Sequence, residues 1–347
     1  MYIKKILIAA SIVGLVVLGG ISIYIYTIIF SPNTAFETDT QSVYISSDNS
    51  IQEVVNQLNP LLKDTDNFIT VAKKKGYAGN VKAGHFLLKK GMNNNEIINT
   101  LRSRNVPVQV SFNNQHRLEN LAGRVAEQIE ADSLEVLLAL TSKTFLDSLE
   151  ISALESLKYY IPNTYEFYWN TSGEEFRDRM VNYYDEFWNA QRLKKAEDID
   201  LSPQEVMSLA AIVQKETAQV EERPRVAGVY LNRLRRGMKL QADPTVIFAL
   251  QYENQDFETP IKRVLYKDLE MDSPYNTYKY TGVPPGLIAM PDISSIDAVL
   301  NAESHDYLYF AANPENPGYH QFAKTLAQHN RNARLYQKWV NKQEIYR

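Results

Sequence analysis

One glutamate, Glu216, lies at the end of an amphipathic pattern and could serve as an acid in catalysis. The stretch from Ser202 to Glu205 has the features of a helix start, with Ser as the cap, Pro at the first helical position and Glu at the capping-box position. The residues that follow place one apolar stripe along the helix: Val206, Leu209, Ala210 and Val213. At 100° per residue, Glu216 lies about 20° around the helix from Leu209 and therefore within this stripe.

A carboxyl group on a buried stripe must be protonated, paired or functional, because an unpaired buried charge is costly. Burial raises the pKa of a carboxyl toward neutrality, and a general acid needs this to keep its proton near pH 7. The structural alternative is an ion pair with a nearby arginine, Arg223 or Arg225. The helix alone does not decide between the two interpretations.

More polar groups follow this helix. Residues 221–224, Glu-Glu-Arg-Pro, begin a second helix that Gly237 ends, and residues 238–240 fit a short strand. Asp243-Pro244 begins a third helix, so we interpret Asp243 first as a helix cap and second as a substrate contact. Three polar residues next to apolar positions could bind a sugar or serve as surface groups: Asn232, Arg233 and Gln241.

Two later segments combine aromatic and short polar side chains. Residues 273–286 contain Ser-Pro-Tyr-Asn-Thr-Tyr and Gly-Val-Pro-Pro-Gly, which predict an ordered loop with stacking faces and hydrogen-bonding groups. Residues 307–311 predict a buried strand, followed by turns and His320. His320 could contact a substrate or brace a loop.

The composition excludes several classes of function. The chain has 347 residues and a net charge of −4, which argues against a general nucleic-acid binder. It contains no cysteine, so it has no disulfide, thiolate metal site or lipid-modified cysteine. The five histidines lack metal-binding spacing and there is no glycine-rich phosphate loop, so no metal or cofactor is implied.

The N-terminus predicts a membrane anchor. Residues 6–30 are uncharged and long enough to cross a bilayer as a helix. The segment ends in bulky residues, including Tyr24 and Tyr26, which favours retention over signal-peptide cleavage. Lys4 and Lys5 precede it, so the positive-inside rule predicts a single-pass protein of the cell inner (cytoplasmic) membrane, with residues 1–5 in the cytoplasm and the remainder outside.

Beyond a polar linker, the pattern predicts an α+β chain with two parts. The first has strand–helix–helix–strand order and a further helix, with helices near residues 51–58 and 65–75 and a strand at 84–88. This order resembles the LysM fold. The second is a larger, mainly helical domain with short strands, including a strand at 106–110 and helices at 118–129 and 174–188.

Several separated motifs, taken in order, resemble the MltG (YceG-like) family of endolytic murein transglycosylases. They are IVQKETAQVEERPRVAGVYLNRLRRGMKLQADPTVI at 212–247, SPYNTY at 273–278, GVPPGLI at 282–288, YLYFAANPENPGYHQF at 307–322 and AQHN at 327–330. The resemblance implies that Glu216, in the Lys-Glu-Thr triplet, is the catalytic acid. Gln214 stands where relatives often have Glu, and Met290-Pro291-Asp292 departs from a usual Asn-Pro-Gly turn.

The resemblance also implies an organisation and a chemistry. The expected parts are a cytoplasmic tail (1–5), a transmembrane helix (6–30), a linker (31–41), a LysM-like subdomain (42–105) and a catalytic domain (106–347). Glu216 would cleave the bond between N-acetylmuramic acid and N-acetylglucosamine of peptidoglycan without water, giving 1,6-anhydro ends and terminating nascent strands. The expected substrate-binding residues are Gln241, Asp243, Thr245, Tyr275, Asn276, Thr277, Tyr278 and His320.

Two other functions remain open from the sequence. A hydrolytic muramidase would use a second acid, such as Asp243, to activate water. A non-catalytic scaffold would bind peptidoglycan through the LysM-like part and tether wall-synthesis machinery. Peptidoglycan synthases are partners that the resemblance suggests.

Overall fold

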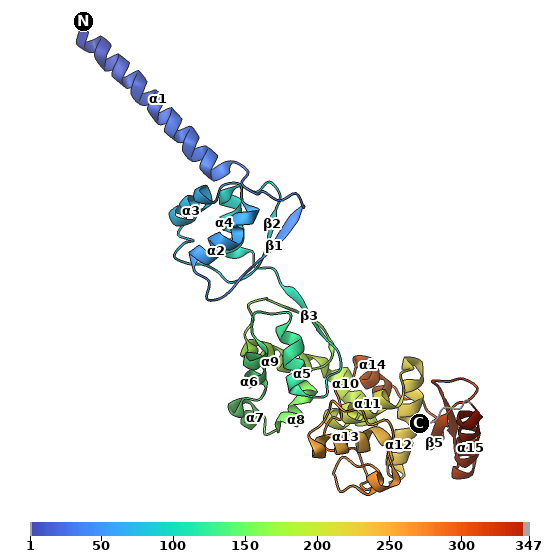
Figure 1. Cartoon of the computed structure of the whole chain (residues 1–347). Helices are drawn as coiled ribbons and strands as arrows, with labels where there is room; N and C mark the ends of the chain where they lie inside the picture. The colour runs from blue at the N-terminus through green and yellow to red at the C-terminus, as the bar shows by residue number, and fades with distance from the viewer. Residues whose placement is uncertain (1, 343–347) are drawn as a thin grey trace. The chain divides into compact units, whose positions relative to one another are not determined.

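The computed structural model describes residues 2–342, and its elements are labelled in Figure 1. Residue 1 of the expected tail and residues 343–347 of the expected catalytic domain lie outside the described residues. The chain forms two compact units. Unit 1 comprises residues 1–110, 128–131 and 166–172, and unit 2 comprises residues 111–127, 132–165 and 173–347. The functional division expected between residues 105 and 106 stays a prediction.

Unit 1 is a small mixed unit that follows a long helix. Its elements are α1 (Tyr2–Phe30), β1 (Thr40–Ile45), α2 (Ile51–Leu58), α3 (Thr65–Lys74), β2 (Gly84–Lys89) and α4 (Asn94–Ser103), with a short 3₁₀ helix at Asn59–Leu61. β1 and β2 pair antiparallel, from Thr40 opposite Lys89 to Ile45 opposite Gly84. The predicted strand–helix–helix–strand order is confirmed, whereas the likeness to a LysM fold stays a prediction.

Local sequence explains why these helices begin where they do. Ser50 and Glu53 form a capping box at the start of α2, and Asn93 and Glu96 form another at α4. Each box satisfies backbone N–H groups that the first helical turn leaves unpaired. Apolar side chains from both strands and all three short helices then meet in one buried core, which includes Ile45, Leu58, Phe68, Phe86 and Ile98.

Helix α1 is the one helix among residues 2–342 that is long and apolar enough to cross a membrane. None of its residues is buried within the protein. Its last turns contact the rest of unit 1, where Asn94 donates a side-chain hydrogen bond of 2.8 Å to the carbonyl of Ile28.

Unit 2 is mainly helical. Its helices are α5 (Leu118–Ala126), α6 (Ser133–Leu140), α7 (Lys143–Ser148), α8 (Ala153–Ser156), α9 (Gly173–Phe187), α10 (Ala190–Asp198), α11 (Pro203–Glu216), α12 (Arg223–Arg235), α13 (Asp243–Asn254), α14 (Ile293–Leu300) and α15 (Leu326–Lys342). Short 3₁₀ helices lie at Leu157–Tyr159, Val220–Glu222 and Tyr266–Glu270. Strand β3 (Val108–Phe112) pairs with β4 (Asn163–Phe167), and each of these strands has residues in both units. Within unit 2, β5 (Tyr309–Ala312) pairs antiparallel with β6 (His320–Ala323).

Helix α11 is the buried centre of unit 2. Every residue from Val206 to Val213 is buried, so the predicted stripe widens into a helix covered on several sides. Ser208 donates its hydroxyl to the carbonyls of Pro284 and Gly286, at 3.1 and 2.6 Å. The side chain of Gln214 accepts hydrogen bonds from the N–H of Asp292 and the hydroxyl of Ser295. The predicted capping box of Ser202 and Glu205 is confirmed.

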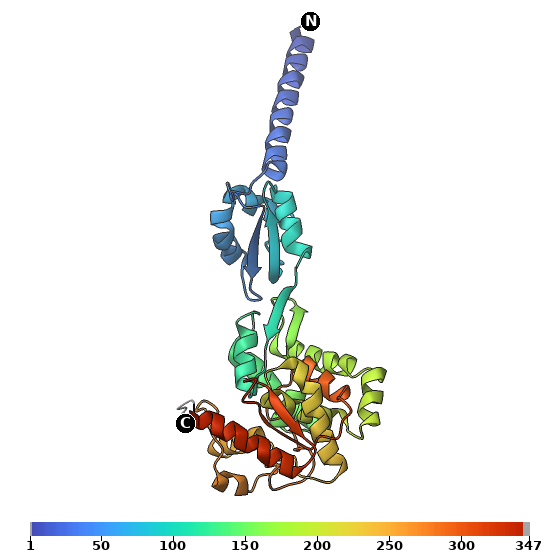
Figure 2. The ribbon, with the colours of Figure 1, turned by 90° about the vertical axis from the view of Figure 1, so that its right-hand side faces the viewer.

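The β5–β6 hairpin lies beside α15, as Figure 2 shows. The strand predicted at 307–311 begins two residues later, at Tyr309. Its residues are half-buried and not fully buried as predicted, because helix α15 covers part of the strand and another part borders a cavity. The strand predicted at 238–240 was wrong, because this segment has no partner strand. It returns to α12 instead, where the N–H of Met238 and the carbonyl of Leu240 both bond to Arg233.

The capping box should control how easily the first turn of α11 opens. We expect Ser202→Ala to increase amide hydrogen exchange in residues 204–207 about fivefold, since losing such a cap costs about 1 kcal/mol. Ser202→Thr keeps the acceptor and should exchange as the parent does. The separate capping box of α4 serves as an internal control, and unchanged exchange in Ser202→Ala would contradict the prediction.

Candidate active site

Glu216 is the last residue of α11 and lies where that buried helix reaches the surface of a cavity. Its carboxyl accepts a 2.8 Å hydrogen bond from the hydroxyl of Tyr230, a buried residue of α12. The alternative partners are engaged elsewhere. Arg223 donates to Ser294 at 2.8 Å, and Arg225 pairs with Glu303 at 2.9 Å. The interpretation of Glu216 as the partner of either arginine was therefore wrong.

The surroundings raise the pKa of Glu216 to about 7. Burial is the main cause, because it disfavours the charged carboxylate. The Tyr230 hydrogen bond acts in the opposite direction by stabilising the charge, while the negative charge of Asp243 raises the pKa further. The pKa of the Tyr230 hydroxyl is itself raised well above its usual value by burial and by Glu216, so the phenol stays a hydrogen-bond donor.

The cavity that Glu216 faces has a volume of about 370 Å³ and opens to solvent. Its wall comes from α11, α12, the start of α13, the 273–278 loop, β5 and the start of α15. The lining residues are Glu216, Tyr230, Arg233, Gln241, Asp243, Tyr278, Tyr309, Phe310, Leu326 and His329. One carboxyl with a near-neutral pKa thus meets aromatic faces and hydrogen-bonding groups, the combination that carbohydrate binding and acid catalysis require.

Of the eight expected substrate-binding residues, the structure brings Gln241, Asp243 and Tyr278 to the cavity wall beside Glu216. The expectation that Asp243 caps α13 was wrong, because Ala242 occupies the cap position and no side-chain cap bond forms. The carboxylate of Asp243 instead accepts a 2.6 Å hydrogen bond from the hydroxyl of Tyr278. Gln241 has a φ of 50°, a strained conformation for a residue with a side chain, and its N–H bonds to the carbonyl of Thr277.

Four other expected residues lie behind the wall and are buried: Thr245, Tyr275, Asn276 and Thr277. The hydroxyls of Thr245 and Thr277 are 2.8 Å apart, and that of Thr277 accepts from the N–H of Ala242. The Asn276 amide donates to the carbonyls of Leu269 and Met271 and accepts from the N–H of Tyr278. The ring of Tyr275 packs against Phe248, with ring centres 4.8 Å apart. Burial and these contacts favour a positioning role for the four residues.

His320 also lies behind the wall. Its ring Nδ1 is 2.7 Å from the carboxylate of Glu222, and the backbone N–H of His320 donates to the same carboxylate at 2.8 Å. Burial raises the pKa of Glu222, but the hydrogen bonds from His320 and Thr217 outweigh it and lower the pKa overall. The ring contacts Phe310 edge-on at 5.0 Å between ring centres. The structure thus favours the bracing role for His320 over the substrate contact.

Sequence reasoning left several cavity residues without a role: Tyr230, Tyr309, Phe310, Leu326 and His329. A signal for Tyr230 existed in its chemistry, because a buried phenol needs a hydrogen-bond partner and Glu216 lies 14 residues before it in the chain. Arg233, a suggested sugar contact, lines the cavity but is held by the carbonyls of Leu308 and Leu240.

Tyr230→Phe removes the hydroxyl that stabilises the charged form of Glu216. We therefore expect this variant to raise the pKa of Glu216 above the parent value of about 7. The measurement is a carbon-13 NMR titration of the glutamate carboxyls, with Glu216 assigned from its absence in Glu216→Gln. Tyr309→Phe removes a hydroxyl from the same cavity without touching this bond, and should leave the pKa unchanged. An unchanged or lower pKa in Tyr230→Phe would refute the assignment.

Comparison with known proteins places these features in a family. A sequence model of the YceG-like family matches residues 43–335. An endolytic murein transglycosylase of Bacillus subtilis is 31% identical over 91% of this chain and 89% of its own length, and one of Streptococcus pneumoniae is 28% identical over 84% of this chain and 57% of its own length. A crystal structure of a yceG-like protein of Listeria monocytogenes, 29% identical, covers 85% of this chain and 99% of that chain with a TM-score of 0.55. The chain belongs to the YceG-like family.

Proposed function

We propose that this protein is a membrane-anchored endolytic lytic transglycosylase that cleaves peptidoglycan strands between N-acetylmuramic acid and N-acetylglucosamine. The observation that carries the proposal is Glu216, an acid with a pKa of about 7 that faces a solvent-accessible cavity lined by aromatic and polar residues. The relatives named endolytic murein transglycosylases support the same reaction class and substrate.

In the reaction, Glu216 has two successive tasks. The protonated carboxyl gives its proton to the glycosidic oxygen as the bond to the muramic acid carbon breaks, and N-acetylglucosamine leaves as an alcohol. The muramic acid then carries oxocarbenium character at that carbon. The Glu216 carboxylate takes the proton of the muramic acid's 6-hydroxyl as its oxygen closes the 1,6-anhydro ring. Glu216 is protonated again at the end, so one carboxyl suffices.

The other groups of the cavity support this cycle. The carboxylate of Asp243, held by Tyr278, places negative charge beside the developing oxocarbenium ion. Tyr309 and Phe310 give the wall aromatic surface against which a sugar can pack, and Gln241 offers an amide. The buried contacts of Asn276 and Thr277 hold Tyr278 and the 241–243 segment in register.

The N-terminal part would hold the enzyme at the outer surface of the inner membrane. Helix α1 would cross the inner membrane with Lys4 and Lys5 on the cytoplasmic side, leaving the rest of unit 1 and all of unit 2 outside. The LysM-like part at 42–105 would bind glycan while residues 106–347 perform the chemistry. An enzyme held at the membrane would cut strands near the synthases that extend them, and so terminate nascent strands.

Glu216→Gln should lower the rate of strand cleavage about 10²–10⁴-fold, because the amide cannot donate the proton. The measurement is mass spectrometry of purified glycan strands after digestion, counting 1,6-anhydro ends. Glu205→Gln is the matched control, since Glu205 lies on the same helix and glutamine can keep its capping contact.

Three outcomes would contradict parts of this proposal. Reducing muramic acid ends in place of anhydro ends would make the enzyme a hydrolytic muramidase. Cleavage by Glu216→Gln at the parent rate would remove Glu216 from the chemistry. An inactive parent that still binds strands would favour the scaffold function.

Activity should depend on pH through Glu216. The carboxyl must be protonated to begin the reaction, so kcat/KM should fall as pH rises through about 7. Initial rates measured across pH 5–9 would test this, and a rate that does not fall above pH 7 would contradict the role of Glu216 as the acid.

A further inference from the structure

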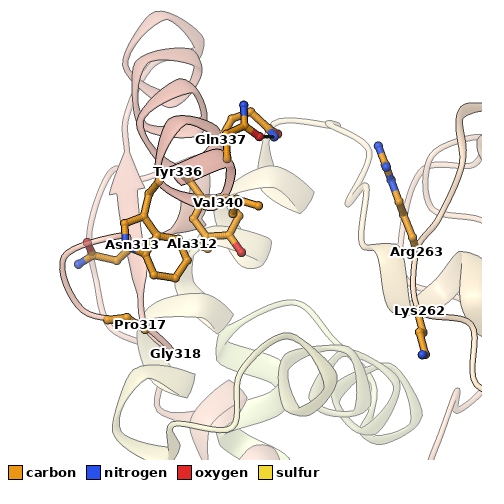
Figure 3. A pocket seen from close by; sticks show the side chains of 11 residues that line it. Lys262, Arg263, Ala312, Asn313, Pro317, Gly318, Tyr336, Gln337 and Val340 are labelled. Carbon is orange, nitrogen blue, oxygen red and sulfur yellow. Dashed lines mark hydrogen bonds between the residues drawn. The ribbon is translucent and has the colours of Figure 1, made fainter. Parts of the chain in front are cut away.

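A second cavity, of about 570 Å³, lies in unit 2 apart from the residues that line the candidate active site. Figure 3 shows its walls. Tyr336 and Val340 of α15 and the turn between β5 and β6 form one side, and Lys262 and Arg263 lie on a loop across the opening. The proposed reaction makes no use of this cavity.

The two cavities share one helix face. Leu326 and His329 of α15 line the active-site cavity, while Tyr336 and Val340 line the second. His329 and Tyr336 are seven residues apart, about two helical turns or roughly 10 Å, and so lie on the same face. Ala333, midway on that face, has a small side chain that obstructs little.

Strand β5, like helix α15, borders both cavities. Tyr309 and Phe310 line the active-site cavity, whereas Ala312 and Asn313, at and just beyond the end of the strand, line the second. At about 3.3 Å per residue, Phe310 and Ala312 are roughly 7 Å apart. An extended polymer seated over Glu216 can therefore continue along α15 and β5 into the second cavity.

The charge of the second cavity differs from that of the active site. Among the described residues that line it, Lys262 and Arg263 are the charged ones and none is a carboxylate. Within residues 2–342, neither cation forms a hydrogen bond or ion pair. Stacked Tyr336 and Trp339, with ring centres 5.9 Å apart, and the amides of Asn313 and Gln337 complete the lining. An uncharged sugar needs no cations, so this lining fits an anionic group attached to the strand.

We propose that this cavity binds the carboxylate-bearing peptide stem of a muramic acid neighbouring the cleaved bond. Peptide stems are the anionic branches of an otherwise uncharged strand core, and the cavity lies along the strand's path from the active site. The inference rests on the proposed function for the identity of the polymer. It gives the enzyme a means to distinguish strands with stems from stripped strands.

The test compares binding by full-length protein to uncrosslinked glycan strands with intact stems and to the same strands stripped by an amidase. The amidase removes the stem but leaves a short lactyl carboxylate on each muramic acid, so the comparison tests for the stem and not for negative charge alone. All proteins carry Glu216→Gln, so strands stay whole during the measurement. Lys262→Glu/Arg263→Glu should lower affinity for stem-bearing strands about tenfold and for stripped strands less than about twofold. Lys262→Gln/Arg263→Gln should show the same selectivity with a smaller loss and guards against misfolding of the reversed variant.

Lys338→Glu is the matched control. Lys338 is an exposed cation on α15, the helix that forms one wall of the cavity, but it does not line the cavity itself. It should bind both strands as the parent does. Equal losses on stem-bearing and stripped strands, or no loss on either, would overturn the stem site. Binding is measured without any cleavage, so the two proposals can fail separately. If the wild-type digest contains no anhydro ends, the proposed function is refuted, but the binding comparison still decides whether the cavity recognises stems.

Discussion

The hydrogen bond between Tyr230 and Glu216 balances two opposing influences on one proton. Burial favours the protonated carboxyl, and the C-terminal end of a helix, with its negative dipole end, acts in the same direction. The phenol stabilises the carboxylate and limits the rise, so the pKa settles at about 7. An acid of ordinary pKa would lose its proton before reaching a substrate, and one of far higher pKa would be slow to release it. The acid and base tasks of a single carboxyl require this intermediate position.

The rest of unit 2 maintains that balance. Helix α11 is covered along its length, and Ser208 and Gln214 fasten it to the 284–286 and 292–295 segments, so its last residue cannot drift into solvent. Behind the wall, Thr245, Asn276 and Thr277 bond to one another's segments and to backbone groups. A buried polar group without a hydrogen-bond partner destabilises the fold. Here the partners come from the 241–245 and 269–278 segments, so satisfying these groups also fixes the two segments against each other.

How much the sequence predicts depends on the range of the interaction. The Ser202 capping box and the stripe to Glu216 are local, and both were predictable. Asp243 had the pattern of a cap, but Tyr278, 35 residues away, takes its carboxylate, and no local pattern reports such a partner. Tyr275, Asn276 and Thr277 look alike in sequence whether they face a substrate or an interior, because Tyr, Asn and Thr hydrogen-bond equally well in either setting. The β5–α15 wall was missed because it forms through packing of segments far from Glu216 in sequence.

Asp243 bears on whether water can compete with the sugar's own hydroxyl. In a hydrolase the second carboxylate must take a proton from water, and it needs basicity to do so. The pKa of Tyr278 is raised by burial and by its bond to Asp243, so the phenol keeps its proton and continues to donate. The bond occupies Oδ1 of Asp243, so this oxygen already has a partner before any water molecule approaches. Its charge still stabilises a neighbouring cation. In the proposed reaction, the Tyr278–Asp243 pair would supply negative charge beside the sugar, and Glu216 would be the base that closes the ring.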